Sequence, residues 1–115
     1  YQVVDKPDYR GNWHESSCSM LFTCAVMRCV RLGLLPRSAL EQAKKGLDGV
    51  HTCVHITKDN EFVLNKICVG TGIGSYEYYI KRETSANDLH GMGAYLLMCA
   101  EAIKTFGENT AAEIE

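Results

Sequence analysis

Two stretches of this chain are apolar around almost the whole circumference of a helix. The first helix is predicted over about 15–33, and within 20–32 its only charges are Arg28 and Arg31. The second stretch, 89–100, contains no Asp, Glu, Lys or Arg, and His90 is its only basic residue. A helix that is apolar all round is stable when it is buried all round. The pattern therefore predicts two helices that lie in the interior of a structure.

The segment between them predicts a helix of the opposite kind. One apolar stripe is formed by Leu40, Ala43, Leu47 and Val50, and charged or amide side chains occupy the other faces. Such a helix lies on a surface with one face inward. Ser38 and Glu41 have the spacing of a capping box, which predicts that Ser38 caps the start of this helix.

A β-hairpin and a long loop are predicted next. Val54 and Ile56, and then Phe62 and Leu64, alternate with polar neighbours, and Lys-Asp-Asn-Glu between them has the composition of a turn. The Gly- and Tyr-rich segment 70–88 is predicted to be a loop. Loops of this length inside compact domains are usually functional or closing elements.

The order of elements predicts a layered fold. Asn87 or Asp88 caps the last helix, where Gly91 and Gly93 let a neighbouring backbone come close. An interior helix, a surface helix, a hairpin with a loop and a second interior helix follow one another. A three-helix bundle has no interior deep enough to surround even one helix. We therefore expect a mainly α fold in which 1–115 form one domain, as a slice of a larger ring of inner and outer helices or with other chains covering it.

Composition and charge narrow the function without identifying it. The 115 residues carry a formal net charge of -2, which provides no basic patch for nucleic acid, and no apolar run reaches the length of a membrane span. The six cysteines include no Cys-x-x-Cys pair and lie mostly in apolar helical runs, as reduced, buried thiols do. We predict a cytoplasmic protein. The start at Tyr1, with no signal peptide, predicts a trimmed N-terminus.

Three segments, in this order, resemble glycoside hydrolase family 105, the unsaturated rhamnogalacturonyl hydrolases. They are "NWHESSCSMLFTCAVMRCVRLGLL", which contains the Trp-x-Glu-[Thr/Ser]-Ser pattern, then "KKGLDGV", and then "ICVGTGIGSYEYYIKRETSANDLHGMGAYLLMCAEAIK". The last segment contains Gly-Thr-Gly-x-Gly, a Tyr-Tyr pair and Asn-Asp-x-x-Gly-x-Gly-Ala. The resemblance covers about 1–104. Family 88, the unsaturated glucuronyl hydrolases, has the same fold and fits these motifs less well.

The resemblance implies a fold and a reaction. The fold is the (α/α)6 barrel, a toroid of six inner and six outer helices, of which this chain would be the C-terminal part with about three helices and a small hairpin. The reaction removes an unsaturated galacturonyl residue from a pectin-derived oligosaccharide of the rhamnogalacturonan type. An aspartate protonates the 4,5 double bond and activates water, and the hydrated product then rearranges and releases the sugar. This is general acid–base chemistry, and it implies no cofactor and no metal.

The catalytic residue is not assigned to any position of this chain. The resemblance places the catalytic aspartate, and a Trp-Gly-Arg-x-x-x-Trp type segment, upstream of the matched region. Here no Arg is followed by Trp at that spacing, and the only Trp is Trp13. We therefore expect these 115 residues to be inactive by themselves, with a missing N-terminal part or further copies in a homo-oligomer completing the structure.

Substrate-binding residues are expected in the loops that precede the two inner helices. The resemblance implies that these loops surround the substrate cleft, and the candidates are Trp13, His14, Glu15, Ser17, Thr71 and His90. Trp13 would stack on a sugar face, Glu15 and Ser17 would bond hydroxyls, and His90 would reach a uronate carboxylate. The structural alternatives are that Trp13 fills the core and that Glu15 and Asp88 cap their helices.

Other interpretations of the same residues remain. Gly-Thr-Gly-Ile-Gly follows a predicted strand, but no helix is predicted directly after it and the Lys of a phosphate-binding loop is missing. His51, Cys53 and His55 have a spacing that suits a metal, although a structural role is favoured and no metal is assigned. Two further classes of function are a non-catalytic helical module that binds itself or another polypeptide and a small metal-binding protein.

Overall fold

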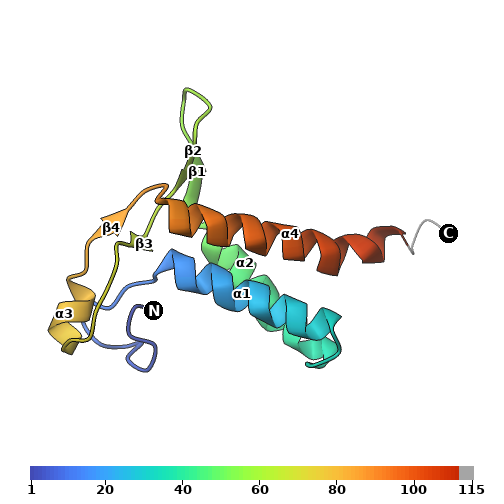
Figure 1. The fold of residues 1–115 in the computed structure, drawn as a ribbon, viewed down its shortest axis with the longest axis horizontal. Coiled ribbons are helices and arrows are strands. Elements are labelled where there is room, and N and C mark those ends of the chain that lie inside the picture. Colours follow the sequence, from blue (N-terminus) through green and yellow to red (C-terminus); the bar gives the residue numbers. More distant parts are fainter. Residues whose placement is uncertain (112–115) are drawn as a thin grey trace.

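The computed structural model describes residues 1–111, with side chains as far as residue 107. This part of the chain contains the long helices α1 (Ser16–Arg31), α2 (Leu40–His51) and α4 (Leu89–Ala111), with the short helices η1 (Arg37–Ala39) and α3 (Tyr76–Ile80). α1 and α4 lie side by side and run in the same direction, and α2 packs against α1 in the opposite direction (Figure 1). The predicted mainly α fold, with its inner–outer–inner order, is confirmed.

Two short antiparallel strand pairs join the helices. β1 (Val54–Ile56) pairs with β2 (Phe62–Leu64), so that His55 lies opposite Val63, and the predicted hairpin is confirmed. It projects from the helical layer (Figure 1). A second pair, β3 (Ile67–Cys68) and β4 (Thr84–Ser85), was not predicted. It brings together the two ends of the segment that contains α3, so the predicted loop is an ordered substructure.

The helix starts follow the sequence in two cases out of three. Glu15 is the N-cap of α1. Asp88 precedes α4, and its Oδ1 accepts the His90 N–H at 3.3 Å, as predicted for a cap. The capping box at Ser38 is wrong, because Ser38 lies inside η1 and α2 begins after Ala39 without a side-chain cap. The chain coming out of Pro36 turns through a 3-10 helix first, which moves Ser38 away from the start of α2.

The core lies between the three long helices and the strands. α1 contributes Met20 and Met27, which are fully buried, and α4 contributes Met98. Gly91 of α4 packs so closely on Ile67 that an added Cβ would lie 2.4 Å from that side chain. The sequence predicted a neighbouring backbone here, whereas the group that comes close to Gly91 is the Ile67 side chain. Gly93 faces no neighbour within 4 Å, so the same prediction is wrong there.

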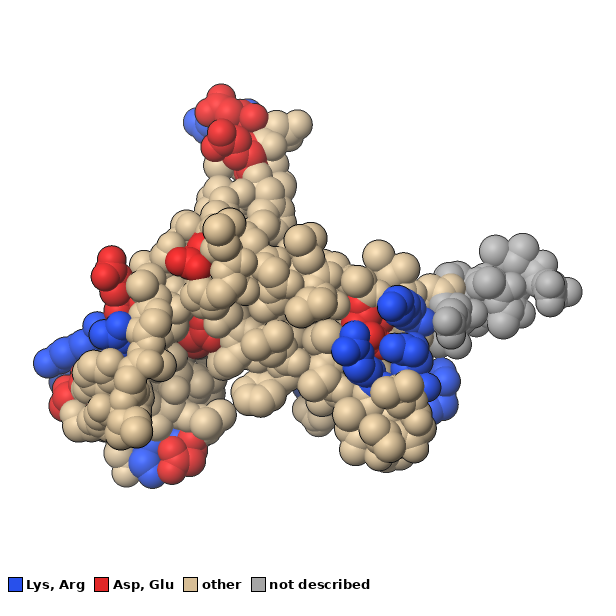
Figure 2. All heavy atoms as spheres, in the orientation of Figure 1, with Lys and Arg blue, Asp and Glu red and all other residues tan. Residues whose placement is uncertain are grey.

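Large apolar side chains of α1 and α4 remain in contact with solvent. Phe22 of α1 is 65% exposed, and Leu96 and Ile103 of α4 are 64% and 72% exposed. The chain measures 54 × 38 × 21 Å, and its thickness is about two helix diameters, so no helix is enclosed on all sides. On the face shown in Figure 2, charged side chains gather at the hairpin tip, around α3 and near the C-terminal end of α1, while much of the middle is uncharged. The predicted need for further covering is therefore visible in the structure.

The fold gives no membrane-crossing element in the part described. Among the helices of residues 1–111, none combines the length and the apolar character that a bilayer span requires.

Candidate functional site

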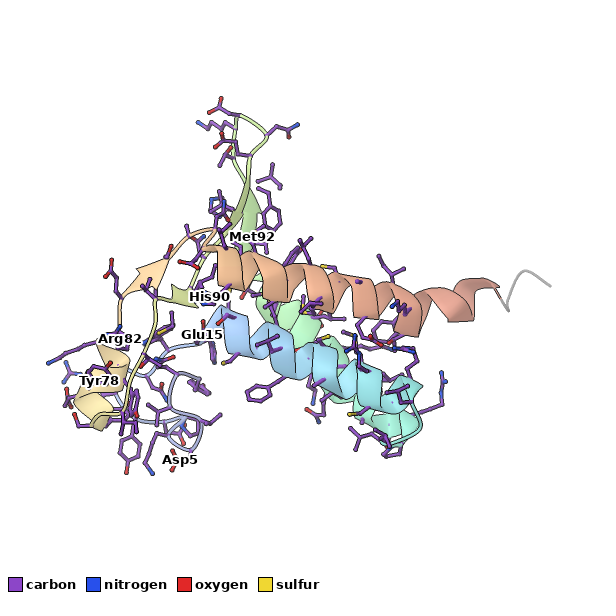
Figure 3. All side chains as sticks on the ribbon, in the orientation of Figure 1. Asp5, Glu15, Tyr78, Arg82, His90 and Met92 are labelled. Carbon is purple, nitrogen blue, oxygen red and sulfur yellow. The ribbon has the colours of Figure 1, made fainter. Side chains whose placement is uncertain are left out.

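An open cleft of about 490 Å³ lies where α1 and α4 begin. Its walls come from these two helix starts, from β3 and from the segment after β3, and they include Glu15, Ser17, Cys68, Thr71, Tyr79 and His90. Figure 3 shows Glu15 and His90 at the neighbouring starts of α1 and α4. Four of the six residues predicted from the sequence, Glu15, Ser17, Thr71 and His90, are thus brought together.

Glu15 is a buried structural carboxylate. Its side chain is the N-cap of α1, where Oε2 accepts the Cys18 N–H at 2.7 Å and Oε1 accepts the N–H and the hydroxyl of Ser17. Oε1 also accepts the Cys68 N–H at 2.9 Å, which ties β3 to α1. Burial opposes the charge most strongly, but these donors outweigh it and hold the pKa of Glu15 below its usual range. The capping alternative weighed from the sequence is what the structure shows.

Trp13 and His14 lie away from the walls of this cleft. Trp13 is half-buried and donates its indole N–H to the Ile80 carbonyl at 3.2 Å, which joins the N-terminal segment to the end of α3. His14 is exposed, and its ring lies 4.3 Å from that of Tyr1. His14 instead borders a second cavity of about 350 Å³ between α1 and α2. The sequence grouped these two residues with Glu15 because they are its neighbours, and the turn into α1 sends them elsewhere.

His90 is oriented by the residue that caps its helix. The Nδ1 atom of His90 lies 2.6 Å from Oδ1 of Asp88, which also accepts the His90 backbone N–H. Half of the His90 side chain is exposed at the cleft. An imidazole whose Nδ1 is engaged by a carboxylate has its Nε2 atom available for a ligand.

Gly70 and Thr71, which line the cleft, belong to a glycine-rich loop, residues 70–74, and α3 follows this loop directly. Ser75 caps α3 by accepting the Tyr78 N–H at 3.3 Å, so the prediction that no helix follows this loop is wrong. α3 has only five residues, and the Lys of a phosphate-binding loop is absent from the segment. The Gly72 N–H, followed by the Thr71 hydroxyl, lowers the pKa of Tyr78 by stabilising its phenolate.

The wall residues that were not selected from the sequence are Gln2, Cys18, Cys68, Gly70 and Tyr79. Tyr79 belongs to a Tyr-Tyr pair that the sequence marks, and that pair was the available signal. No local pattern in the sequence distinguishes Gln2. Its position at the cleft depends on a hydrogen bond between segments, in which its backbone N–H donates to the Trp13 carbonyl at 2.7 Å.

The Cys18 thiol beside the cleft lacks the ionised form that a nucleophile needs. All six cysteines are free. Burial, followed by the neighbouring Glu15 carboxylate, raises the pKa of Cys18 to about 11, so this thiol stays protonated at neutral pH. As for a metal, His51 and His55 are exposed while Cys53 is buried. Among the described residues, no three His, Cys, Asp or Glu side chains come together in a metal-binding group.

The C-terminal end of α1 is joined to the middle of α4 by ion pairs to a buried carboxylate. Glu101 is 1% exposed, and its carboxylate accepts from Arg31 Nε at 2.6 Å and from Arg28 Nε at 3.2 Å. Arg31 Nη2 makes a third contact at 3.3 Å. These two arginines, which lie in the last turn of α1, therefore link α1 to α4. The hydrogen bond from Arg31 lowers the pKa of Glu101 most, and together with Arg28 it outweighs burial.

Two parallel helices backed by an antiparallel one, with a cleft at the starts of the parallel pair, match the inner–outer–inner order expected for a segment of a double-layered helical toroid. The family model described as Glycosyl Hydrolase Family 88 matches residues 1–106, and the chain belongs to this family. The glycoside hydrolase relationship indicated by the sequence motifs is thereby confirmed.

Solved structures extend this relationship to family 105. A C. acetobutylicum glycoside hydrolase from family 105 is 38% identical with a TM-score of 0.82, and the match covers 88% of this chain and 30% of that one. A possible member of the family from Salmonella enterica, 22% identical with a TM-score of 0.72 over 86% of this chain and 25% of that one, supports the fold alone. The mainly α toroid segment expected from the motifs is what these structures share.

Curated relatives are also partly covered. Protein Atu3128 of Agrobacterium fabrum and the 24.9 kDa protein in the picA locus of Rhizobium radiobacter are each 27% identical over 116 residues. The match takes in 89% of this chain and 50% of each relative, so the chain spans half the length of the curated relatives it matches.

Proposed function

We propose that this chain forms part of the substrate cleft of a hydrolase that removes unsaturated galacturonyl residues from rhamnogalacturonan oligosaccharides. The observation that carries the proposal is the cleft at the starts of α1 and α4, where Ser17, Thr71 and His90 converge. The likeness to a family 105 hydrolase at 38% identity favours this substrate class over the glucuronyl substrates of family 88.

The proposed work of this segment is binding rather than chemistry. The hydroxyls of Ser17 and Thr71 are suited to sugar hydroxyl groups. The Nε2 atom of His90 is available for a hydroxyl or, when the ring is protonated, for a uronate carboxylate. Both carboxylate oxygens of Glu15 already accept hydrogen bonds within the fold. We therefore propose that Glu15 maintains the shape of the cleft and makes no contact with the ligand. Trp13 and His14 would reach substrate only outside this cleft.

The test uses the full natural protein and an unsaturated galacturonyl-rhamnose disaccharide. Hydration of the 4,5 double bond removes its ultraviolet absorbance, and this loss is followed with time. An unsaturated glucuronyl disaccharide is the matched comparison. We expect faster turnover of the galacturonyl substrate. A preference for the glucuronyl substrate, or no turnover of either, would reject the assignment.

We further propose that residues 1–115 alone do not turn over this substrate. The general acid–base step requires a carboxyl group at the reacting double bond. None of the five aspartates, Asp5, Asp8, Asp48, Asp59 and Asp88, is among the described residues that line the cleft. The carboxylate that does line it, Glu15, has both oxygens engaged by hydrogen bonds within the fold. Turnover by the purified 115-residue chain, at a rate comparable with that of the full protein, would contradict this.

A second candidate is a non-catalytic helical module that associates with copies of itself. The exposed side chains of Phe22, Leu96 and Ile103 favour it, because large uncovered apolar surfaces mark interaction sites. Light scattering on the 115-residue chain distinguishes the two. A stable oligomer supports the module, whereas a chain that is soluble only with the remaining toroid supports the hydrolase segment. The six free cysteines lead us to propose a reducing, cytoplasmic location for either.

A further inference from the structure

The glycine-rich loop of residues 70–74 is held through its backbone by side chains that follow it. The N–H of Gly72 donates to the Tyr78 hydroxyl at 3.0 Å, and the N–H of Gly74 donates to the Tyr79 hydroxyl at 3.1 Å. Arg82 donates from Nη2 to the Val69 carbonyl at 2.9 Å and also to the Gly70 carbonyl. The loop therefore has an anchor at its start, its middle and its end.

The same side chains stack on one another. The guanidinium of Arg82 lies 5.1 Å from the centre of the Tyr78 ring, and the Tyr78 and Tyr79 rings meet edge to face at 5.4 Å. Gly74 lies directly against Tyr78, and an added Cβ there would come within 2.4 Å of the ring. The loop thus wraps around an aromatic and cationic stack that only glycine lets it approach so closely.

The anchored loop supplies one wall of the cleft. Gly70 and Thr71 line the cleft, and Tyr79 lies beside them. Ile73, at the tip, is fully exposed and provides no anchor of its own. A segment with three glycines in five residues loses much conformational entropy when it is ordered, so its order depends on the bonds from Tyr78, Tyr79 and Arg82.

We propose that Tyr78 and Arg82 are positioning residues that hold loop 70–74 as a preformed wall, so that the oligosaccharide binds without ordering the loop. This rests on the proposed function, because it takes the cleft as the sugar site. Neither residue lines the cleft, so each acts through Thr71 and its neighbours. Ordering a loop in advance lowers the entropic cost of binding and strengthens affinity without touching the chemical step.

The test is Tyr78→Phe in the full natural protein. This variant keeps the ring under Gly74 and Arg82 and removes the acceptor of the Gly72 N–H. We expect the KM for the unsaturated galacturonyl-rhamnose disaccharide to rise about threefold to tenfold with kcat unchanged, as the loss of one net hydrogen bond predicts. Hydrogen exchange of the Gly72 amide should accelerate by a similar factor. Arg82→Lys, which loses the planar stack, should raise KM further.

Tyr76→Phe is the matched control on the same helix. The Tyr76 hydroxyl donates to the Arg10 carbonyl at 3.1 Å, away from the loop, so this variant should leave KM and loop exchange as they are. Equal effects of Tyr76→Phe and Tyr78→Phe, or a faster Gly72 amide without a change in KM, would overturn the positioning role. If the unmutated protein ignores the disaccharide, the proposed function fails. The exchange comparison still decides whether Tyr78 holds the loop, and equal exchange in wild type and Tyr78→Phe rejects that.

Discussion

Two buried glutamates, Glu15 at the start of α1 and Glu101 of α4 beside the end of α1, are stabilised in different ways. Glu15 is 3% exposed and Glu101 is 1% exposed, and the pKa of each lies below its usual range. Backbone N–H groups and one hydroxyl surround Glu15, whereas two arginine side chains surround Glu101. A helix N-terminus offers unpaired N–H groups to an anion, and a helix C-terminus does not.

The difference shows which end of the helix pair is available for a ligand. At the Glu101 end, the charged side chains are used to hold the two helices together. At the Glu15 end backbone N–H groups and the Ser17 hydroxyl do this work, and Ser17, Thr71 and His90 line the cleft. The charged side chains around Glu101 thus stabilise the packing of α1 on α4, whereas the proposed binding cleft lies beside Glu15.

The largest expected effect comes from Glu101→Ala. It leaves Arg28 and Arg31 facing each other without their shared anion. Removing one partner of a buried ion pair should lower the free energy of unfolding by about 3 kcal/mol. We expect the lower end of the usual range because the half-exposed Arg28 can turn to solvent once Glu101 is gone. Denaturant unfolding of the full protein measures it. Asp5→Asn, which breaks an exposed pair with Lys6, is the control and should change nothing measurable. KM should be unaffected by Glu101→Ala once the protein is folded.

Glu15→Ala should be the next largest. It removes the cap of α1 and leaves the buried Cys68 N–H without an acceptor. We expect a loss of about 2 kcal/mol in the free energy of unfolding, together with a rise in KM, since β3 carries the loop that lines the cleft. Glu41→Ala, in the exposed first turn of α2, is the matched control. Equal losses from Glu15→Ala and Glu41→Ala would mean that the cap contributes nothing.

Lowering the pH should reduce the contributions of Glu15 and Glu101 to the stability of the folded protein. Because each folded-state pKa is depressed, each carboxylate contributes stability that is fully present above the ordinary value of 4.5 and is lost as the pH falls through the folded-state pKa. Unfolding free energy should therefore be steady above about pH 5 and should fall below it. The slope in acid should be smaller in Glu101→Gln than in wild type. An unchanged slope would show that Glu101 is protonated in the folded protein.

His90→Ala should affect binding and leave stability nearly unchanged. The side chain is half exposed, and its ring contacts only Asp88 among the hydrogen-bond partners described. Losing one polar ligand contact should raise KM for the disaccharide by about tenfold. His51→Ala, an exposed histidine away from the cleft, is the control. A parallel loss of stability and activity would place His90 in the fold rather than in the site.

Ser38→Ala should have the smallest effect. The sequence predicted a capping box here, but the structure gives Ser38 no capping hydrogen bond. The free energy of unfolding should change by less than about 0.5 kcal/mol, as for ordinary surface positions. A loss close to that of Glu15→Ala would restore the capping box and contradict the 3-10 turn before α2.

Short-range patterns predicted the elements well. The apolar stretch of α1, the single stripe of α2 and the alternation in β1 and β2 all reflect how one side chain follows the next along a helix or strand. Capping by Asp88 was also found, since it involves residues two positions apart. The capping box at Ser38 had the right spacing, but the prediction was wrong because the backbone forms the 3-10 helix η1 there before α2 begins.

Long-range partners were not predictable in this way. The bond from Glu15 to the Cys68 N–H spans 53 residues, and the bonds from Glu101 to Arg31 span 70. The same holds for Trp13 and Ile80, 67 residues apart, whose bond draws Trp13 away from the cleft. No local signal in the sequence marks any of these pairs, because each depends on the path of the chain between its members.

The sequence by itself determined which segments form the three long helices, which of their faces are apolar and to which family the chain is related, because these follow from residue order and from motifs. The tertiary structure alone determined that both Glu15 carboxylate oxygens are bonded within the fold. It also determined that His90 and Thr71 line one cleft and that Arg28 and Arg31 share the buried Glu101 carboxylate. Burial and pairing depend on distances between segments, and only the packed helices and strands set those distances.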